Sequence, residues 1–168
     1  MKILLLSNPN SPHTVKWARA LADRGLKIYI FGLSNYDGSL YQNYKNIKIY
    51  SLKLHSAITE DSETKISKLI YLKAVPAVKK MIAEFKPDLV HAHYASSYGL
   101  IGALSGFHPF ILSVWGGDVF DFPKKSFLHR ELIKFNLRKA DKILSTSHVM
   151  AKETGKYTRQ AIAVTPFG

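Results

Sequence analysis

Residues 2–31, KILLLSNPNSPHTVKWARALADRGLKIYIF, decide the fold because they contain two strand patterns with a helix pattern between them. The opening apolar run is typical of a strand that is covered on both faces of a parallel sheet. Ser11 followed by Pro12 is a helix-start signal, with serine as the cap and proline at the first helical position. The helical spacing ends at Gly25, and residues 26–31 form the second strand pattern. This segment therefore predicts a strand–helix–strand crossover unit.

The remainder of the chain continues the alternation of strand and helix patterns. Strands are predicted at residues 47–52, 89–93, 110–114, 143–145 and 161–164, and helices at residues 63–86, 96–104, 126–140 and 147–155. Residues 33–46 have the composition of a loop, and residues 55–62 look irregular. Pro76 lies inside a predicted helix, so a kink or two helices are expected there. The pattern predicts one α/β domain, a Rossmann-like doubly wound parallel sheet with helices on both faces.

Composition narrows the possible chemistry of the chain. The absence of cysteine excludes disulfides, cysteine-ligated zinc and thiol nucleophiles. No run of about 18 apolar residues is present, and the opening run is too short for a signal peptide, so we expect a cytoplasmic protein. The net charge of +12 favours anionic partners, with an inert basic surface as the alternative interpretation.

Ligands of open parallel sheets bind at the carboxyl ends of the strands, so the first candidate is the loop at residues 8–13. It contains Asn10, Ser11 and His13 and leads into a helix N-terminus, where free backbone N–H groups can hold an anion. Neither a dinucleotide-binding glycine motif nor a P-loop is present. The alternative interpretation is a simple capped turn.

A histidine pair ends the predicted strand at residues 89–93. Strand alternation places His91 and His93 on the same face. Two histidines without a third ligand do not make a metal site, and no metal is expected. We expect one imidazole to pack in the core and the other to point into a cleft, where it can take part in phosphate binding or acid–base work.

The segment after the strand at residues 110–114 is a further candidate. Gly116 and Gly117 allow close approach of the backbone to a ligand, and Asp118 can accept hydrogen bonds from sugar hydroxyls. Trp115 can pack against a sugar ring or a lipid chain. The alternative is a tight turn with a buried tryptophan.

The helix predicted at residues 126–140 belongs to a strongly basic stretch. Between residues 124 and 142 the basic residues are Lys124, Lys125, Arg130, Lys134, Arg138, Lys139 and Lys142, and the acidic ones are Glu131 and Asp141. Leu128, Leu132 and Phe135 mark an apolar stripe, which either faces the core of a solvated helix or lies on an anionic bilayer. No catalytic triad spacing, nucleophile elbow, RNA-recognition signature or helix-turn-helix signature is present.

Five segments, in this order, resemble landmarks of the group-1, family-4 glycosyltransferases. They are residues 1–7 (MKILLLS), 11–25 (SPHTVKWARALADRG), 87–94 (PDLVHAHY), 113–119 (SVWGGDV) and 164–168 (VTPFG). The resemblance implies the N-terminal half of a GT-B fold, in which this domain binds the acceptor and a second domain binds a nucleotide-sugar donor. It further implies sugar transfer with retention, no metal and no cofactor. Glycan, glycolipid or cell-envelope polysaccharide precursors are the implied acceptors, and the implied location is cytoplasmic or peripheral at the inner face of the membrane.

The resemblance also assigns residues and boundaries. Ser11 and His13 match a loop that faces the donor phosphates and the acceptor, and His93 matches a cleft position. Gly116, Gly117 and Asp118 match a cleft loop in which many members carry histidine where this chain has Trp115, so no imidazole role is assigned there. Residues 1–168 correspond to the acceptor-side domain. The paired-glutamate motif of the donor domain is absent, so we expect this chain alone to be inactive.

Two alternatives to the acceptor half of a retaining glycosyltransferase stay open. The first is a stand-alone basic module that binds a phosphorylated ligand, an anionic membrane surface or nucleic acid. The second is another enzyme of the GT-B type, such as a nucleotide-sugar epimerase or a phosphorylase. For the glycosyltransferase itself, no nucleic-acid partner is expected.

Overall fold

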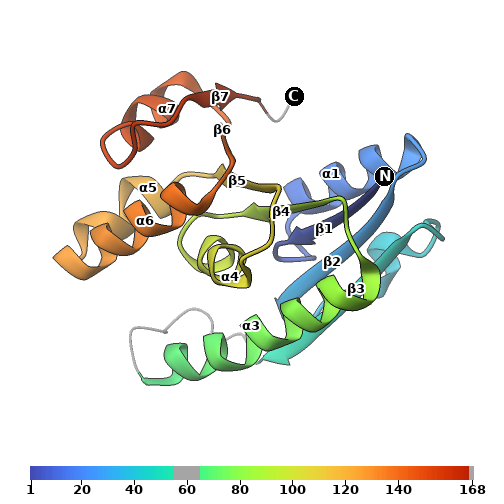
Figure 1. Ribbon diagram of the computed structural model, residues 1–168. Helices are drawn as coiled ribbons and strands as arrows, with labels where there is room; N and C mark the ends of the chain where they lie inside the picture. The colour runs from blue at the N-terminus through green and yellow to red at the C-terminus, as the bar shows by residue number, and fades with distance from the viewer. Residues whose placement is uncertain (55–64, 167–168) are drawn as a thin grey trace. The chain divides into compact units, whose positions relative to one another are not determined.

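Strands and helices alternate along the chain in the computed structural model, which describes residues 1–54 and 65–166 (Figure 1). Two compact units follow one another, residues 1–88 and residues 89–168. All strand pairs within each unit are parallel. The predicted Rossmann-like α/β fold class is confirmed.

The first unit is built on three parallel strands in the order β3-β2-β1. Its elements are β1 (Lys2–Leu6), α1 (Pro12–Asp23), β2 (Lys27–Ser34), the 3₁₀ helix η1 (Gly38–Tyr41), β3 (Ile47–Leu54) and α3 (Lys65–Phe85). Leu4, Leu5, Leu6, Ile28 and Ile30 are fully buried, as the apolar runs require of strands covered on both faces. Helix α3 continues through Pro76 as one helix, so the expected alternative of two helices is wrong. The segment expected to be irregular, residues 55–62, lies outside the described residues.

The second unit is built on four parallel strands in the order β4-β5-β6-β7. Its elements are β4 (Leu89–His93), α4 (Ser97–Ser105), β5 (Phe110–Val114), α5 (Gly117–Phe120), the 3₁₀ helix η2 (Phe122–Lys124), α6 (Phe127–Lys139), β6 (Lys142–Ser145), α7 (His148–Thr154) and β7 (Ile162–Val164). The sequence did not predict α5 and η2, because a four-residue and a three-residue helix are too short to show a period.

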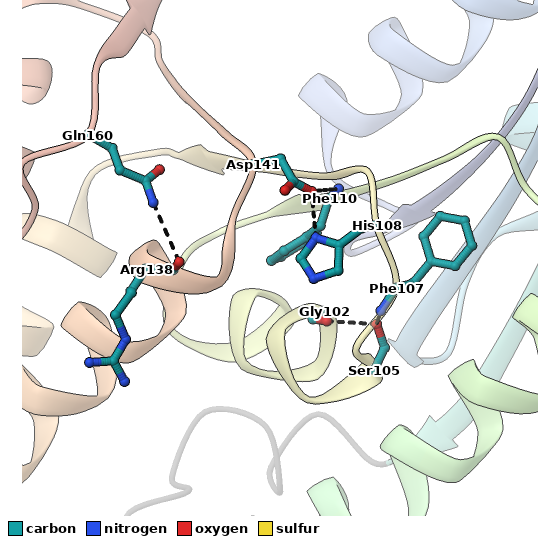
Figure 2. A network of polar contacts seen from close by, with 8 residues as sticks. All are labelled: Gly102, Ser105, Phe107, His108, Phe110, Arg138, Asp141 and Gln160. Carbon is teal, nitrogen blue, oxygen red and sulfur yellow. Dashed lines mark hydrogen bonds and ion pairs between the residues drawn. The ribbon is translucent and has the colours of Figure 1, made fainter.

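A small polar network fixes the amino ends of β5 and β6 in the second unit (Figure 2). Asp141 Oδ2 accepts a hydrogen bond from the Phe110 N–H at 2.6 Å and lies 2.7 Å from His108 Nδ1. Partial burial tends to raise the pKa of Asp141, but these two hydrogen bonds outweigh it and hold the pKa below its ordinary value. The network lies at the end of β5 opposite to its carboxyl end.

Candidate functional site

Three neighbouring strands of the second unit end at one edge of its sheet. His93 of β4 pairs with Ser113 of β5, and Val114 of β5 pairs with Ser145 of β6. The connections that follow, beginning at Tyr94, Trp115 and Thr146, therefore leave the same edge. This is the edge at which open parallel sheets bind ligands.

Asp118 joins two of these connections through backbone hydrogen bonds. Its side chain is completely buried, at 0% exposure. Oδ2 accepts from the Ala95 N–H at 2.6 Å, and Oδ1 accepts from the Gly116 N–H at 2.8 Å and from the Trp115 N–H at 3.1 Å. The connection after β4 is thus tied directly to the connection after β5.

Asn136 of α6 holds the same connection from a second direction. Its side chain is fully buried, and Nδ2 donates to the Ala95 carbonyl at 2.8 Å and to the Ser96 carbonyl at 3.4 Å. The backbone around Ala95 is therefore fixed by a carboxylate at its N–H and by an amide at its carbonyl. Such fixed backbone gives the side chains on either side a defined position.

The contacts of Asp118 support a positioning role. Burial raises the pKa of Asp118 above its ordinary value, and the backbone N–H groups of Ala95, Trp115 and Gly116 act against that rise. Its hydrogen bonds go to the chain's own backbone, whereas the sequence suggested bonds to sugar hydroxyls. Direct contact between Asp118 and a substrate stays a prediction.

Tyr94 and Trp115 are the large side chains that this backbone carries at the edge. Tyr94 is 36% exposed and has a positive φ of 78°, a conformation that non-glycine residues adopt mainly where the surroundings enforce it. Trp115 is partly buried, and its ring centroid lies 4.6 Å from that of His93. Burial and the negative charges of Asp118 and Asp121 raise the pKa of Tyr94, so its hydroxyl stays protonated at neutral pH.

The two glycines make room for this arrangement. Gly116 has a φ of 135°, which side chains rarely adopt. A Cβ at Gly117 would lie 2.9 Å from the Tyr94 hydroxyl oxygen, so the tyrosine hydroxyl lies close over the start of α5. Sequence reasoning did not select Tyr94 as a site residue. Its position directly after the histidine that ends the strand was the available signal.

The histidine pair lies on one face, as strand alternation predicts. The ring centroids of His91 and His93 are 4.5 Å apart. His91 Nε2 lies 2.7 Å from Ser113 Oγ, and complete burial lowers the pKa of His91 to about 4, so it is neutral at pH 7. Both histidines are buried, so the expected division into a core imidazole and a cleft imidazole is not what the structure has. A role of His93 in substrate binding stays a prediction.

The other predicted site residues lie in the first unit, after β1. Asn10 ties its loop to the connection after β2, because its Oδ1 accepts from the Asp37 N–H and its Nδ2 donates to the Asn35 carbonyl, both at 2.9 Å. Ser11 occupies the cap position of α1 without a side-chain capping hydrogen bond, and His13 is exposed in the first turn. The roles of Asn10, Ser11 and His13 in substrate binding stay predictions.

Residues 1–54 and 65–166 contain no group of three or more histidine, aspartate or glutamate side chains arranged to hold a metal ion. Over the same residues, no helix is both long enough and apolar enough to cross a membrane.

The fold is that of the N-terminal domain of a GT-B protein. Residues 2–147 match the family described as Glycosyl transferase 4-like, and the chain belongs to that family. No curated protein sequence matches the chain significantly.

Several solved structures share the fold at low sequence identity. The UDP-GlcNAc 2-epimerase of Neisseria meningitidis bound to UDP-GlcNAc is 14% identical with a TM-score of 0.66, covering 98% of this chain and 46% of that chain. HepE of Anabaena in complex with UDP is 17% identical with a TM-score of 0.64, covering 100% and 44%. UGT2 of Phytolacca americana, in complex with UDP-2-fluoro-glucose and pterostilbene, is 12% identical with a TM-score of 0.62, covering 98% and 53%. The chain thus spans about half the length of these proteins.

Proposed function

We propose that the chain is the acceptor-binding half of a retaining glycosyltransferase. In this proposal the complete enzyme moves a sugar from a nucleotide-sugar donor to a glycan, a glycolipid or a cell-envelope polysaccharide precursor. Membership of the Glycosyl transferase 4-like family over residues 2–147 is the observation that carries the proposal. The solved complexes of Anabaena HepE with UDP and of Phytolacca americana UGT2 with UDP-2-fluoro-glucose support a nucleotide-sugar donor.

The edge of the second unit supplies groups suited to an acceptor sugar. An aromatic face such as that of Trp115 packs against the apolar face of a sugar ring, and a neutral tyrosine hydroxyl such as that of Tyr94 can donate and accept hydrogen bonds. Asp118 contributes by fixing the backbone on which both side chains stand. In this account Tyr94 and Trp115 contact the acceptor, and Asp118 is a positioning residue.

The remaining half of the reaction is assigned to a donor-binding domain outside residues 1–168. The activated phosphate of the donor and the developing charge of the transition state need groups on both sides of the transferred sugar. We therefore propose that the chain alone binds acceptor without turning over substrate. We also propose that the complete enzyme uses neither metal nor cofactor.

A nucleotide-sugar epimerase is the second candidate, because the Neisseria meningitidis structure with the same fold is a UDP-GlcNAc 2-epimerase. An epimerase acts on the nucleotide sugar itself and needs no acceptor. Family membership favours transfer over epimerisation. The two functions differ in their products, which makes them separable by experiment.

The fluorescence of Trp115 tests acceptor binding directly. The chain has two tryptophans, Trp17 and Trp115, so Trp17→Phe leaves Trp115 as the single reporter. We expect saccharide glycosides to change the emission of this variant and UDP-glucose alone to leave it unchanged. A second variant, Tyr94→Phe in the same background, removes only the tyrosine hydroxyl. It should weaken the response while the protein stays folded. A response to UDP-glucose but to no saccharide would contradict the assignment of an acceptor half.

A further inference from the structure

Helix α6 exposes two large apolar side chains at its start. Phe127 is 68% exposed and Leu128 is 77% exposed. The buried face of α6 consists of Ile133, Asn136 and Leu137. The predicted core stripe that began at Leu128 is therefore wrong in its register, and the apolar pair at the start of the helix has no place in the core.

The same helix borders a cationic groove, the α6 groove, which runs between α6 and the connection from α7 to β7. It consists of two hollows that share Lys134, Lys156 and Tyr157. The cations that line it are Lys124, Arg130, Lys134, Arg138, Lys156 and Arg159, and no carboxylate is among the lining residues.

Two of these six cations are neutralised by neighbouring carboxylates. Lys134 Nζ lies 2.7 Å from a Glu131 carboxylate oxygen, and Lys156 Nζ lies 2.6 Å from one of Glu153. The groove keeps a clear excess of positive charge after these pairs are subtracted. Phe127 lines one of the two hollows together with Lys124 and Arg130, and the exposed Leu128 is its neighbour at the start of α6.

We propose that this surface docks on an anionic lipid bilayer. Phe127 and Leu128 enter the headgroup region, and the cations of the α6 groove face the lipid phosphates. Apolar side chains beside a basic helix face are the combination by which peripheral proteins hold an anionic interface. Each lysine or arginine near such a surface adds about 1 kcal/mol of attraction, which is about fivefold in affinity.

The apolar pair distinguishes a bilayer from other anionic partners. A soluble phosphate ligand gives no reason for Phe127 and Leu128 to protrude, and a leucine offers no planar face on which a nucleic-acid base can stack. A bilayer satisfies both the charges and the apolar side chains. The proposal is independent of the donor and acceptor chemistry proposed above.

Co-sedimentation of the 168-residue chain with lipid vesicles tests the proposal. The vesicles contain phosphatidylcholine alone or with about 30% phosphatidylglycerol, in about 0.1 M salt, where the Debye length of about 10 Å leaves contact charges effective. We expect binding to the anionic vesicles only. Phe127→Ser with Leu128→Ser should weaken it about tenfold, given the apolar area withdrawn from the interface.

Charge variants separate a local surface from general basicity. Arg130→Gln with Arg138→Gln should weaken binding to anionic vesicles about 25-fold, as the product of two fivefold effects. Lys45→Gln with Lys79→Gln removes the same charge from exposed positions of the first unit and should change it less than threefold. The two arginines and two lysines that are changed are all exposed, so their replacement should leave the fold intact. Circular dichroism melts would verify that each variant, including the apolar double variant, is folded.

Three results would overturn the proposal. The first is a lack of binding to anionic vesicles by the folded chain. The second is equal vesicle binding by the apolar double variant and the unaltered chain, which would mean that the groove holds phosphate groups by charge alone. The third is a DNA duplex that displaces the chain from vesicles and is bound equally by the apolar double variant, which would identify nucleic acid as the partner.

Discussion

Removing the Asp118 carboxylate should destabilise the chain substantially. Asp118→Ala leaves three backbone N–H groups without their acceptor, those of Ala95, Trp115 and Gly116. Ala95 is fully buried, so leaving its N–H without an acceptor costs about 1–3 kcal/mol of folding stability. Trp115 and Gly116 are only partly buried, so water can accept hydrogen bonds from their N–H groups in place of the carboxylate. We expect the free energy of unfolding to fall by about 3 kcal/mol in total.

Urea unfolding followed by far-ultraviolet circular dichroism measures this change, and Asp121→Ala is the matched control. Asp121 is the same residue type three positions further on and is exposed, so its loss should change the free energy of unfolding by less than about 0.5 kcal/mol. A loss of under about 0.5 kcal/mol in Asp118→Ala as well would refute the positioning role. The buried hydrogen bonds would then not hold the two connections together.

Three further changes probe both units. Burial lowers the pKa of His91 to about 4, whereas the pKa of a histidine in the unfolded chain is near 6.5, so the unfolded chain binds this proton more readily. The free energy of unfolding is therefore highest above about pH 6.5 and falls by about 2–3 kcal/mol from pH 7 to pH 4.5. His91→Gln should remove that part of the slope in urea titrations at the two pH values, and an unchanged slope would count against it. Gly116→Ala, at a φ of 135°, should cost about 1–3 kcal/mol in a thermal melt, and an unaltered Tm would show that the loop relaxes. Gly32→Ala would place a Cβ 2.6 Å from the ring of Pro9, so urea unfolding should show a loss of about 1–3 kcal/mol unless the loop after β1 moves freely.

The strands and most helix ends could be predicted because their signals are local. Ser147 was predicted to begin a helix, and its Oγ does accept a hydrogen bond from the Met150 N–H at 3.2 Å. Gly25 was predicted to end a helix and has a φ of 80°, and Gly106, which follows the helix predicted at residues 96–104, has a φ of 71°. Glycine adopts both values without strain. Signals of this kind depend on a few neighbouring residues and do not depend on contacts with the rest of the chain.

The buried face of α6 could not be predicted because it depends on a distant partner. A periodic count of apolar residues selected Leu128 and gave no reason to select Asn136. In the structure Asn136 is buried, and the Ala95 and Ser96 carbonyls accept its amide hydrogens across 41 and 40 residues of sequence, respectively. No periodic pattern contains that information.

The location of the candidate site could be predicted from the sequence, but the roles of its individual residues could not. The strand-end rule selected the segment at Trp115 and Asp118, and both belong to one hydrogen-bonded edge. Asp118 is buried with its carboxylate hydrogen-bonded to the chain's own backbone, and Tyr94 has a positive φ. Both properties exist only in the folded chain.

Sugar transfer by the complete product of the gene that encodes this chain tests the central proposal most directly. The assay incubates that protein with isotope-labelled nucleotide sugars and an extract of envelope lipids and glycans, and follows the anomeric protons by NMR. The proposal predicts label in an acceptor-linked product with the anomeric configuration of the donor, undiminished by EDTA. Conversion of UDP-GlcNAc to an epimer without acceptor, or an acceptor-linked product of inverted configuration, would contradict it.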